Sequence, residues 1–218
     1  MSTFPGSPKL LRGGLVLVDP TSGAVVRVIA LQYNPDTLTR TLQPKAVTDS
    51  QDRSQALRLT GPPVETIKID AEIDATDQLE LPDQHPAAVQ LGIAPQIASL
   101  ETLLYPTSGQ LLANDALQSS GTLEITPVET PLALFVWSKE RVVPVRVTDF
   151  SVTEEAFDPK LNPTRAKVSL SLRVLSVDDL GFSNKGGSLY MIYQQNKERL
   201  AQRATGGTLA LLGLTGIP

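Results

Sequence analysis

The chain has 218 residues, of which 41% are hydrophobic, so it is long enough to bury a substantial core, and one domain with an appendage is the expected organisation. It has no cysteine, which excludes disulfide bonds, thiolate metal sites and cysteine nucleophiles. Its formal net charge is −4, and its 19 lysines and arginines are scattered without a long basic run, which argues against nucleic-acid binding.

The N-terminal half begins with a flexible arm over residues 1–12, where two prolines, a glycine and two serines disfavour regular structure. Two apolar strands over 15–18 and 24–33 flank the turn sequence DPTSG, which predicts a β-hairpin. Alternation resumes over 37–42, and the polar, proline-bounded segment 43–63 is expected to be a long loop that orders against a neighbour.

Residues 64–74 predict a half-buried strand, because polar and apolar residues alternate from Thr66 to Asp74. The inward face comprises Ile67, Ile69, Ala71 and Ile73, and the outward face Thr66, Lys68, Asp70 and Glu72. The acids Asp70, Glu72, Asp74 and Asp77 have the composition of a calcium site. The first three, however, are spread along one strand face without a glycine-hinged loop, so no metal site is expected.

The middle of the chain predicts one helix over 86–105, followed by a polar loop over 106–121. Gly92 and Pro95 weaken the middle of this helix, so that its regular part is expected to begin near Pro95. Its core-facing stripe is predicted to be Val89, Ile93, Ile97, Leu100 and Leu104. The dense apolar run 132–137 then reads as a strand buried on both faces, with Trp137 as a core anchor.

A long β-hairpin dominates residues 142–175. Its strands, 142–157 and 165–175, are joined by a turn containing Asp158-Pro159 and Asn162-Pro163. Pro144 lacks a backbone donor, which places that end of the first strand at a sheet edge or a bulge. The second strand is predicted to point Ala166, Val168, Leu170, Leu172 and Val174 inward.

The C-terminal part is expected to stand apart from the β domain. The glycine-rich residues 181–187 suggest a linker, and 189–204 predict a helix with Leu189, Ile192, Tyr193, Asn196 and Leu200 along one stripe. Such a helix is interpreted as a docking element rather than as part of the core, so that removal of 187–218 should leave the fold intact. We therefore predict an α+β protein: an antiparallel β-barrel or sandwich with one flanking helix and a C-terminal helical extension.

Residues suited to catalysis are scarce. His85, the only histidine, lies in a polar loop entering a helix, and no second imidazole exists to share a site with it. No phosphate-binding GxxxxGK[ST] loop, GxSxG elbow or HExxH motif occurs. The sequence therefore predicts a protein that is not an enzyme and needs no cofactor.

Residues 31–40, LQYNPDTLTR, resemble an N-terminal signature of tube-type proteins of contractile injection systems, in which an aromatic-Asn-Pro triplet ends one strand and opens the next. Residues 131–137, the strand VTDFSV, Phe157 and the step NPTRA resemble the second half of that family in the same order. The chain departs from the family where Ser138-Lys139 replaces a glycine after the tryptophan. Too few residues follow Gly187 for the peptidoglycan-binding LysM domain into which members often continue, which puts direct murein binding in doubt.

The resemblance implies a baseplate or tube-end adaptor that joins the inner tube to the spike complex of a phage-tail-like particle. Its partners would be inner tube, spike and other baseplate proteins, in a ring or another multi-copy arrangement. The corresponding organisation is a flexible arm over 1–12, a tube-like β domain over 13–178, and a helix with an apolar docking tail over 187–218.

The residues expected to contact neighbouring subunits are Tyr33, Asn34, Pro35, Leu189, Ile192, Tyr193 and Leu200. No apolar run reaches the ~20 residues of a membrane span and the N-terminus lacks a secretion signal. We expect synthesis in the cytoplasm and incorporation into a cytoplasmic or released particle. The alternative is a stand-alone carbohydrate- or peptide-binding β module that uses the segments 43–63 and 106–121.

Overall fold

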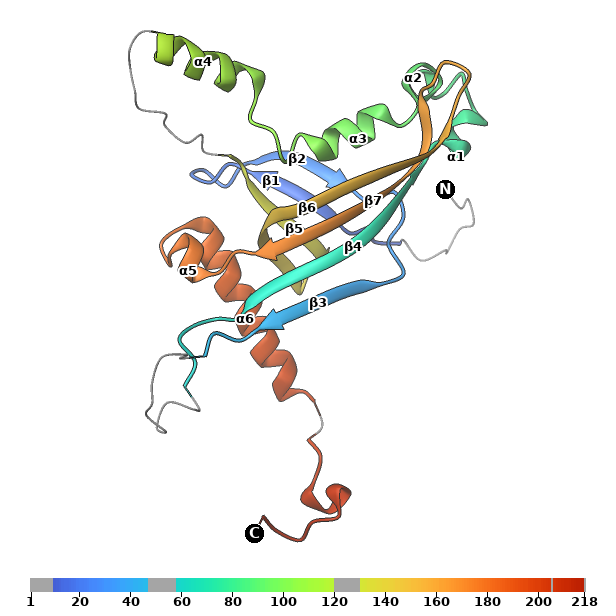
Figure 1. Ribbon diagram of the computed structural model, residues 1–218. Helices are drawn as coiled ribbons and strands as arrows, with labels where there is room; N and C mark the ends of the chain where they lie inside the picture. The colour runs from blue at the N-terminus through green and yellow to red at the C-terminus, as the bar shows by residue number, and fades with distance from the viewer. Residues whose placement is uncertain (1–9, 47–57, 120–129, 205, 218) are drawn as a thin grey trace.

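The computed structural model describes residues 10–46, 58–119, 130–204 and 206–217 (Figure 1). In chain order its elements are β1 (Gly14–Val18), β2 (Val25–Ala30), β3 (Leu38–Gln43), β4 (Val64–Asp74), α1 (Thr76–Leu79), α2 (Pro86–Leu91), α3 (Ala94–Glu101), α4 (Ser108–Ser119), β5 (Leu132–Ser138), β6 (Arg141–Phe157), β7 (Pro163–Val174), α5 (Val177–Leu180), α6 (Lys185–Gln202) and the 3-10 helix η2 (Leu209–Leu212). Residues 1–9 of the predicted arm over 1–12 and residues 47–57 of the predicted loop over 43–63 lie outside the described residues.

The strands form one seven-stranded antiparallel sheet in the order β2-β1-β5-β6-β7-β4-β3. The predicted α+β class with an antiparallel sheet is thus confirmed. The sheet is open, however, and no closed barrel forms, because β2 and β3 end the sheet without pairing with each other in the described part of the chain. The predicted hairpin over 15–33 is formed by β1 and β2, with Asp19 accepting hydrogen bonds from the amides of Thr21 and Ser22 in the turn.

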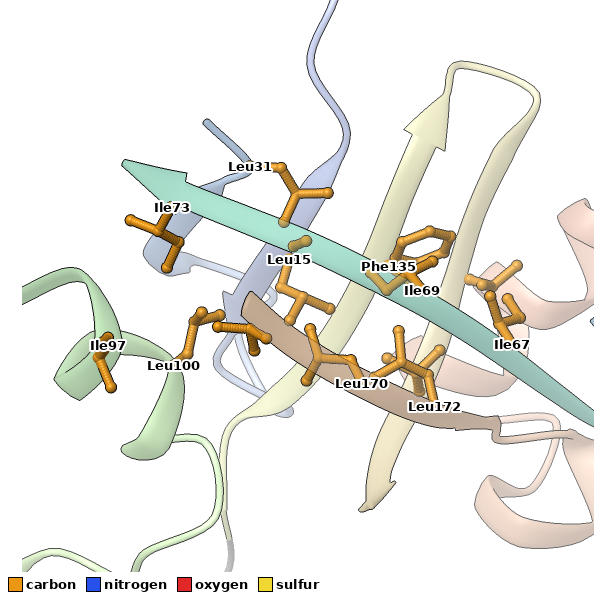
Figure 2. Packing of buried hydrophobic residues seen from close by; sticks show 14 of the residues in the cluster. Leu15, Leu31, Ile67, Ile69, Ile73, Ile97, Leu100, Phe135, Leu170 and Leu172 are labelled. Atoms are coloured by element: carbon orange, nitrogen blue, oxygen red, sulfur yellow. The ribbon is translucent and has the colours of Figure 1, made fainter. Parts of the chain in front are cut away.

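The sheet curls around a single main core, so that strands far apart in the sheet order face one another. Figure 2 shows Ile69 and Ile73 of β4 and Leu170 and Leu172 of β7 in the same cluster as Leu15 and Phe135 of β1 and β5. The predicted inward faces of β4 and β7 are confirmed, because all nine of their residues are buried: Ile67, Ile69, Ala71, Ile73, Ala166, Val168, Leu170, Leu172 and Val174.

Strand β5 is covered on both faces, as predicted. Phe135 lies in the main core and stacks on Trp137 at 5.9 Å between ring centroids. Leu132 and Leu134 point to the opposite face, where Leu180 and Leu189 of the C-terminal helices cover them.

The prediction that Pro144 marks a sheet edge or a bulge is confirmed only locally: β6 lies between β5 and β7 and Pro144 is fully buried, but the ladder with β7 begins only at Val145, so the β6 end that holds Pro144 pairs with β5 alone. The carbonyl of Pro144 accepts a hydrogen bond from Leu175, just past the end of β7. In an antiparallel sheet, the N–H and C=O of one residue point to the same neighbour. The missing donor of Pro144 therefore faces the end of β7, where the ladder stops.

The single helix predicted over 86–105 is interrupted at Gly92, which has φ +58 and lies so close to Pro163 that a Cβ would be 2.0 Å from its carbonyl oxygen. This contact separates α2 from α3. Ile93, Ile97 and Leu100 are buried as predicted, but Val89 and Leu104 are exposed.

The polar loop predicted over 106–121 is wrong, because residues 108–119 form α4. The segment is polar on average, yet its alanines, leucines and glutamines are good helix formers and no proline interrupts it. Figure 1 shows α4 projecting from the body of the molecule.

Residues 181–187 do not act as a linker. Helix α6 begins at Lys185 and packs on the sheet, with Tyr190 and Tyr193 in the main core. The interpretation of residues 189–204 as a docking element separate from the core is therefore wrong for this face of the helix. The two glycines are needed for packing, because a Cβ on Gly187 would lie 1.8 Å from the carbonyl oxygen of Gly181 and one on Gly186 2.4 Å from Leu180.

Candidate assembly surfaces

The aromatic-Asn-Pro triplet between β2 and β3 holds the chain segment that enters β1. The side-chain oxygen of Asn34 accepts a hydrogen bond from the amide of Gly13 at 2.8 Å, and its nitrogen donates to the carbonyl of Leu11 at 2.8 Å. Asn34 thus has a structural role within the chain. Tyr33 is 45% exposed and Pro35 is half-buried, so these two side chains remain accessible.

The four C-terminal residues predicted to contact partners divide between the core and the surface. Tyr193 is only 3% exposed and Leu189 is half-buried against β5, whereas Ile192 and Leu200 are about half exposed, at 53% and 49%. The buried stripe of α6 is Gly186, Gly187, Tyr190 and Tyr193, rotated by about one residue from the predicted stripe. Ile192 and Leu200 therefore form the outward apolar edge of α6.

A buried carboxylate that the sequence analysis did not single out attaches α6 to the sheet. Glu65 of β4 is 3% exposed and accepts hydrogen bonds from Arg40 at 2.8 Å, from the hydroxyl of Tyr193 at 2.8 Å and from Lys197 at 2.9 Å. Burial raises the pKa of Glu65, but the hydrogen bonds from Lys197, Tyr193 and Arg40 outweigh it and hold the pKa below its ordinary value. Burial and the bond to Glu65 raise the pKa of Tyr193.

The sequence contains one indication of this network, which is a polar residue at a strand position that should face inward. Glu65 has the same parity along β4 as the buried Ile67 and Ile69, although it lies before the strictly alternating run. A charge at such a position requires partners from other elements. Which elements supply them, here β3 and α6, depends on the tertiary fold.

Strand β2 presents an apolar edge at one end of the open sheet. Val25, Val26 and Val28 are 63%, 59% and 63% exposed, and β2 pairs only with β1 among the described strands. An edge strand with unpaired backbone groups and large apolar side chains is a template for pairing with another chain. The sequence predicted the strand but not its position at the edge.

The C-terminal tail adds a second exposed apolar segment, which consists of Leu209, Leu211, Leu212, Leu214 and Ile217. None of these side chains is buried against the sheet. The predicted apolar tail is therefore accessible in the structure, and its docking role remains a prediction.

A groove of about 630 Å³ lies at the base of α4, lined by apolar residues such as Leu17, Leu103 and Tyr105 together with Thr107 and Ser108. His85 is half-buried at the start of α2 and lines a smaller groove. Within the described residues, no three His, Cys, Asp or Glu side chains lie together so that they could hold a metal ion. No helix in the described ranges is long and apolar enough to cross a bilayer.

Comparison with known proteins finds no match for the sequence and a likeness in structure. No family model and no curated protein matches this sequence. Among solved structures, the chain is similar to a chain in the tail of an empty GTA particle with C6 symmetry, with 15% sequence identity and a TM-score of 0.29 over 74% of this chain and 90% of that chain.

Proposed function

We propose that this protein is a structural subunit of a phage-tail-like contractile injection particle, placed at the baseplate or tube end where it joins the inner tube to the spike complex. In this role the chain assembles in several copies, with inner tube, spike and other baseplate proteins as partners. It performs no chemistry and needs no cofactor.

The observation that carries the proposal is the apolar edge of β2. A monomer that worked alone would expose three valines and a row of unpaired backbone groups at this edge, which is a liability for aggregation. Pairing of this edge with a neighbouring subunit would cover the valines and provide hydrogen-bond partners for the backbone groups. The aromatic-Asn-Pro triplet, with its accessible Tyr33 and Pro35, and the tail over 206–217 supply further apolar contacts.

The test compares assembly of the wild type with that of Val28→Lys, which places a charge on the exposed face of the β2 edge. Ser151→Lys on the polar outer face of β6 is the matched control, because Ser151 is also an exposed strand residue. Light scattering after size exclusion, with co-expressed tube and spike proteins of the same particle, should show multi-subunit complexes for wild type and Ser151→Lys. Val28→Lys should reduce complex formation about tenfold or more, since a lysine on an edge strand opposes pairing.

A stand-alone binding module remains a second candidate, because the groove at the base of α4 falls within the usual range of ligand pockets, about 300–1,000 Å³. Its ligand would be a peptide or a carbohydrate. If the protein stays monomeric with tube and spike proteins present, while a glycan or peptide binds and Tyr105→Ala abolishes that binding, this second candidate replaces the first.

A further inference from the structure

The molecule has two ends, and β6 connects them. β6 begins at Arg141, beside α6, and ends at Phe157, beside the β6–β7 turn, and its 17 residues span about 50 Å at roughly 3.3 Å per residue. At the far end the turn lies against α1 and α2, because the amide of Ala75 donates to Thr164 and that of Ile93 to Pro163. Figure 1 shows α1 and α2 grouped with the turn at the end opposite α6.

The end that holds the turn, named here the tip, is acidic. Its basic residues Arg165 and Lys167 are neutralised by Asp74 and Glu155. Four further acids are exposed and form no ion pair with any described residue: Asp77, Glu80, Asp83 and Glu154. Lys160, the remaining cation of the turn, forms no salt bridge with a described residue. Hydrogen bonds from Asn162 and, to a lesser extent, the charge of Lys160 lower the pKa of the neighbouring Asp158 carboxyl group.

The opposite end, named here the base, is basic. It is formed by the β5–β6 turn and by residues 192–203 at the end of α6. Arg199 connects the two through its 2.6 Å bond to Glu140. Lys139, Arg141 and Arg203 form no ion pair with a carboxylate in the described ranges, and the one acid there that also has none, Glu198, offsets a single positive charge. The two ends of one chain therefore carry excess charge of opposite sign.

Both ends also expose apolar side chains among these charges. At the tip, Phe157 is 51% and Leu161 80% exposed, and at the base Ile192 and Leu200 are about half exposed. Charge alone would give only weak, screened attraction, whereas apolar residues inside a charged rim are the usual composition of an interface.

Leu161 has a backbone conformation that is unfavourable for leucine. It has φ 66, in the left-handed region that leucine rarely adopts, and it is the residue with positive φ among the described non-glycine residues. The turn is fixed by Asp158, which accepts hydrogen bonds from the amides of Lys160 and Asn162 and from the side chain of Asn162. Asparagine or glycine would suit this position better, so leucine adopts this conformation at a cost, and its exposed side chain lies outside the core of its own chain.

We propose that the tip of one copy docks on the base of a second copy, so that copies of this chain stack head to tail. Leu161 and Phe157 of one copy contact Ile192 and Leu200 of the next, and the four free acids of the tip face Lys139, Arg141 and Arg203. The contact joins two different surfaces, so it is heterologous and does not form a two-fold dimer; where successive rotations do not close a ring, it repeats along one direction. The inference rests on the proposed function in that both require a multi-copy assembly, but it uses neither the β2 edge nor the tail.

Charge reversal tests this arrangement with the full-length chain. The tip-reversed variant carries Glu80→Lys and Glu154→Lys, and the base-reversed variant carries Lys139→Glu and Arg203→Glu. In each variant alone like charges oppose one another, so self-association measured by sedimentation velocity should weaken about tenfold or more. An equimolar mixture should regain wild-type association, because every tip then meets a base of opposite charge. Wild-type association should also fall when NaCl rises from about 0.05 M to about 1 M, where the Debye length is about 3 Å.

Leu161→Asn separates association from folding. Asparagine tolerates the left-handed conformation, so the variant should unfold at the same or a higher temperature than wild type while its self-association weakens. Leu112→Asn is the matched control and should self-associate like wild type, since Leu112 is an exposed leucine of α4, which belongs to neither the tip nor the base. A wild type that stays monomeric at low salt, reversed variants that associate like wild type, or a mixture that fails to recover would each overturn the proposal.

The Val28→Lys variant distinguishes a failure of the stacking proposal from a failure of the proposed function. If stacking is wrong but the proposed function is right, Val28→Lys lowers assembly with tube and spike proteins while the charge-reversed variants assemble normally. If the proposed function is wrong and stacking is right, none of the variants associates with tube or spike proteins, yet the charge-reversed mixture still recovers self-association.

Discussion

A single carboxylate, Glu65, links three elements at the base of the molecule. It receives hydrogen bonds from β3 through Arg40 and from α6 through Tyr193 and Lys197, and the ammonium of Lys197 also lies 4.0 Å from the centre of the Tyr193 ring. A buried charge that loses its partners costs about 3–5 kcal/mol, so each of these contacts depends on the others. Docking of α6 is therefore coupled to the ionisation of Glu65.

The pH dependence of stability follows from the lowered pKa of Glu65. A carboxyl group whose pKa is depressed in the folded state stabilises the fold above its unfolded pKa of about 4.3, and this contribution is lost as the pH falls through the folded value. We expect Glu65→Gln to lower the free energy of unfolding at pH 7 by about 3 kcal/mol, and the difference from wild type to shrink below about pH 4.

Urea unfolding followed by circular dichroism between pH 7 and pH 3 measures this difference. Glu101→Gln is the control and should track the wild type throughout, because Glu101 is a half-buried acid of α3 that forms no ion pair with any described residue. A difference between Glu65→Gln and wild type that stays constant to pH 3 would contradict the coupling.

The glycine pair that begins α6 provides a second prediction at the scale of one residue. Gly187→Ala introduces a methyl group 1.8 Å from the backbone carbonyl of Gly181, which cannot rotate away. Alanine favours a helix over glycine by about 1 kcal/mol, yet we expect a net loss of about 3 kcal/mol from overpacking. Gly206→Ala, where nothing lies within 4 Å, should leave the midpoint of urea unfolding unchanged.

At the scale of elements, the sequence predicts buried residues best in strands that have one buried and one exposed face. The alternation in β4 and β7 correctly identified nine core residues, because a two-residue period leaves no ambiguity about which face is buried. The stripe of α6 was wrong because its buried face consists of glycines and tyrosines, whereas the search for aliphatic side chains favoured Ile192 and Leu200. Close packing between Gly187 and Gly181 is a tertiary contact with no local signal in the sequence.

The burial of Tyr190 and Tyr193 changes the expected effect of truncating the C-terminus. Removal of residues 187–218 deletes both tyrosines from the core, at about 3 kcal/mol or more each, so the shortened chain should fail to unfold cooperatively. Removal of 205–218 deletes, among the described residues 206–217, only exposed side chains, and should shift the melting temperature by less than about 3 °C, as a loss below about 1 kcal/mol would.

Differential scanning calorimetry of the two truncated chains distinguishes these outcomes. The shorter deletion then becomes the proper test of the apolar tail, because it removes the tail while α6 stays docked. Equal stability of the two truncated chains would mean that α6 contributes nothing to the core.

At the scale of the whole molecule, the sequence could not reveal that the sheet stays open. The gap between the edge strand β2 and the end of β4 is here called the seam. The seam is bridged at one end, where the side chain of Gln32 donates to the carbonyl of Asp74 at 2.6 Å and accepts from its amide at 3.0 Å. These are the two hydrogen bonds that a residue of a neighbouring strand would make with the end of β4. A side-chain amide thus substitutes for a missing strand, and a groove of about 380 Å³ lies beside it between β2 and β4.

Loss of this bridge should loosen the seam without unfolding the sheet, because β4 keeps its full ladder with β7. We expect Gln32→Ala to accelerate hydrogen exchange of the Asp74 amide about tenfold, since the lost hydrogen bonds are worth about 1 kcal/mol each, while the amide of Val168 in the centre of β7 keeps its protection. Gln96→Ala is the control, because Gln96 lines the same groove but has no side-chain hydrogen bond to a described residue. Exchange at Asp74 that stays at the wild-type rate in Gln32→Ala would show that β2 and β4 are held together by the core alone, and that the seam needs no substitute strand.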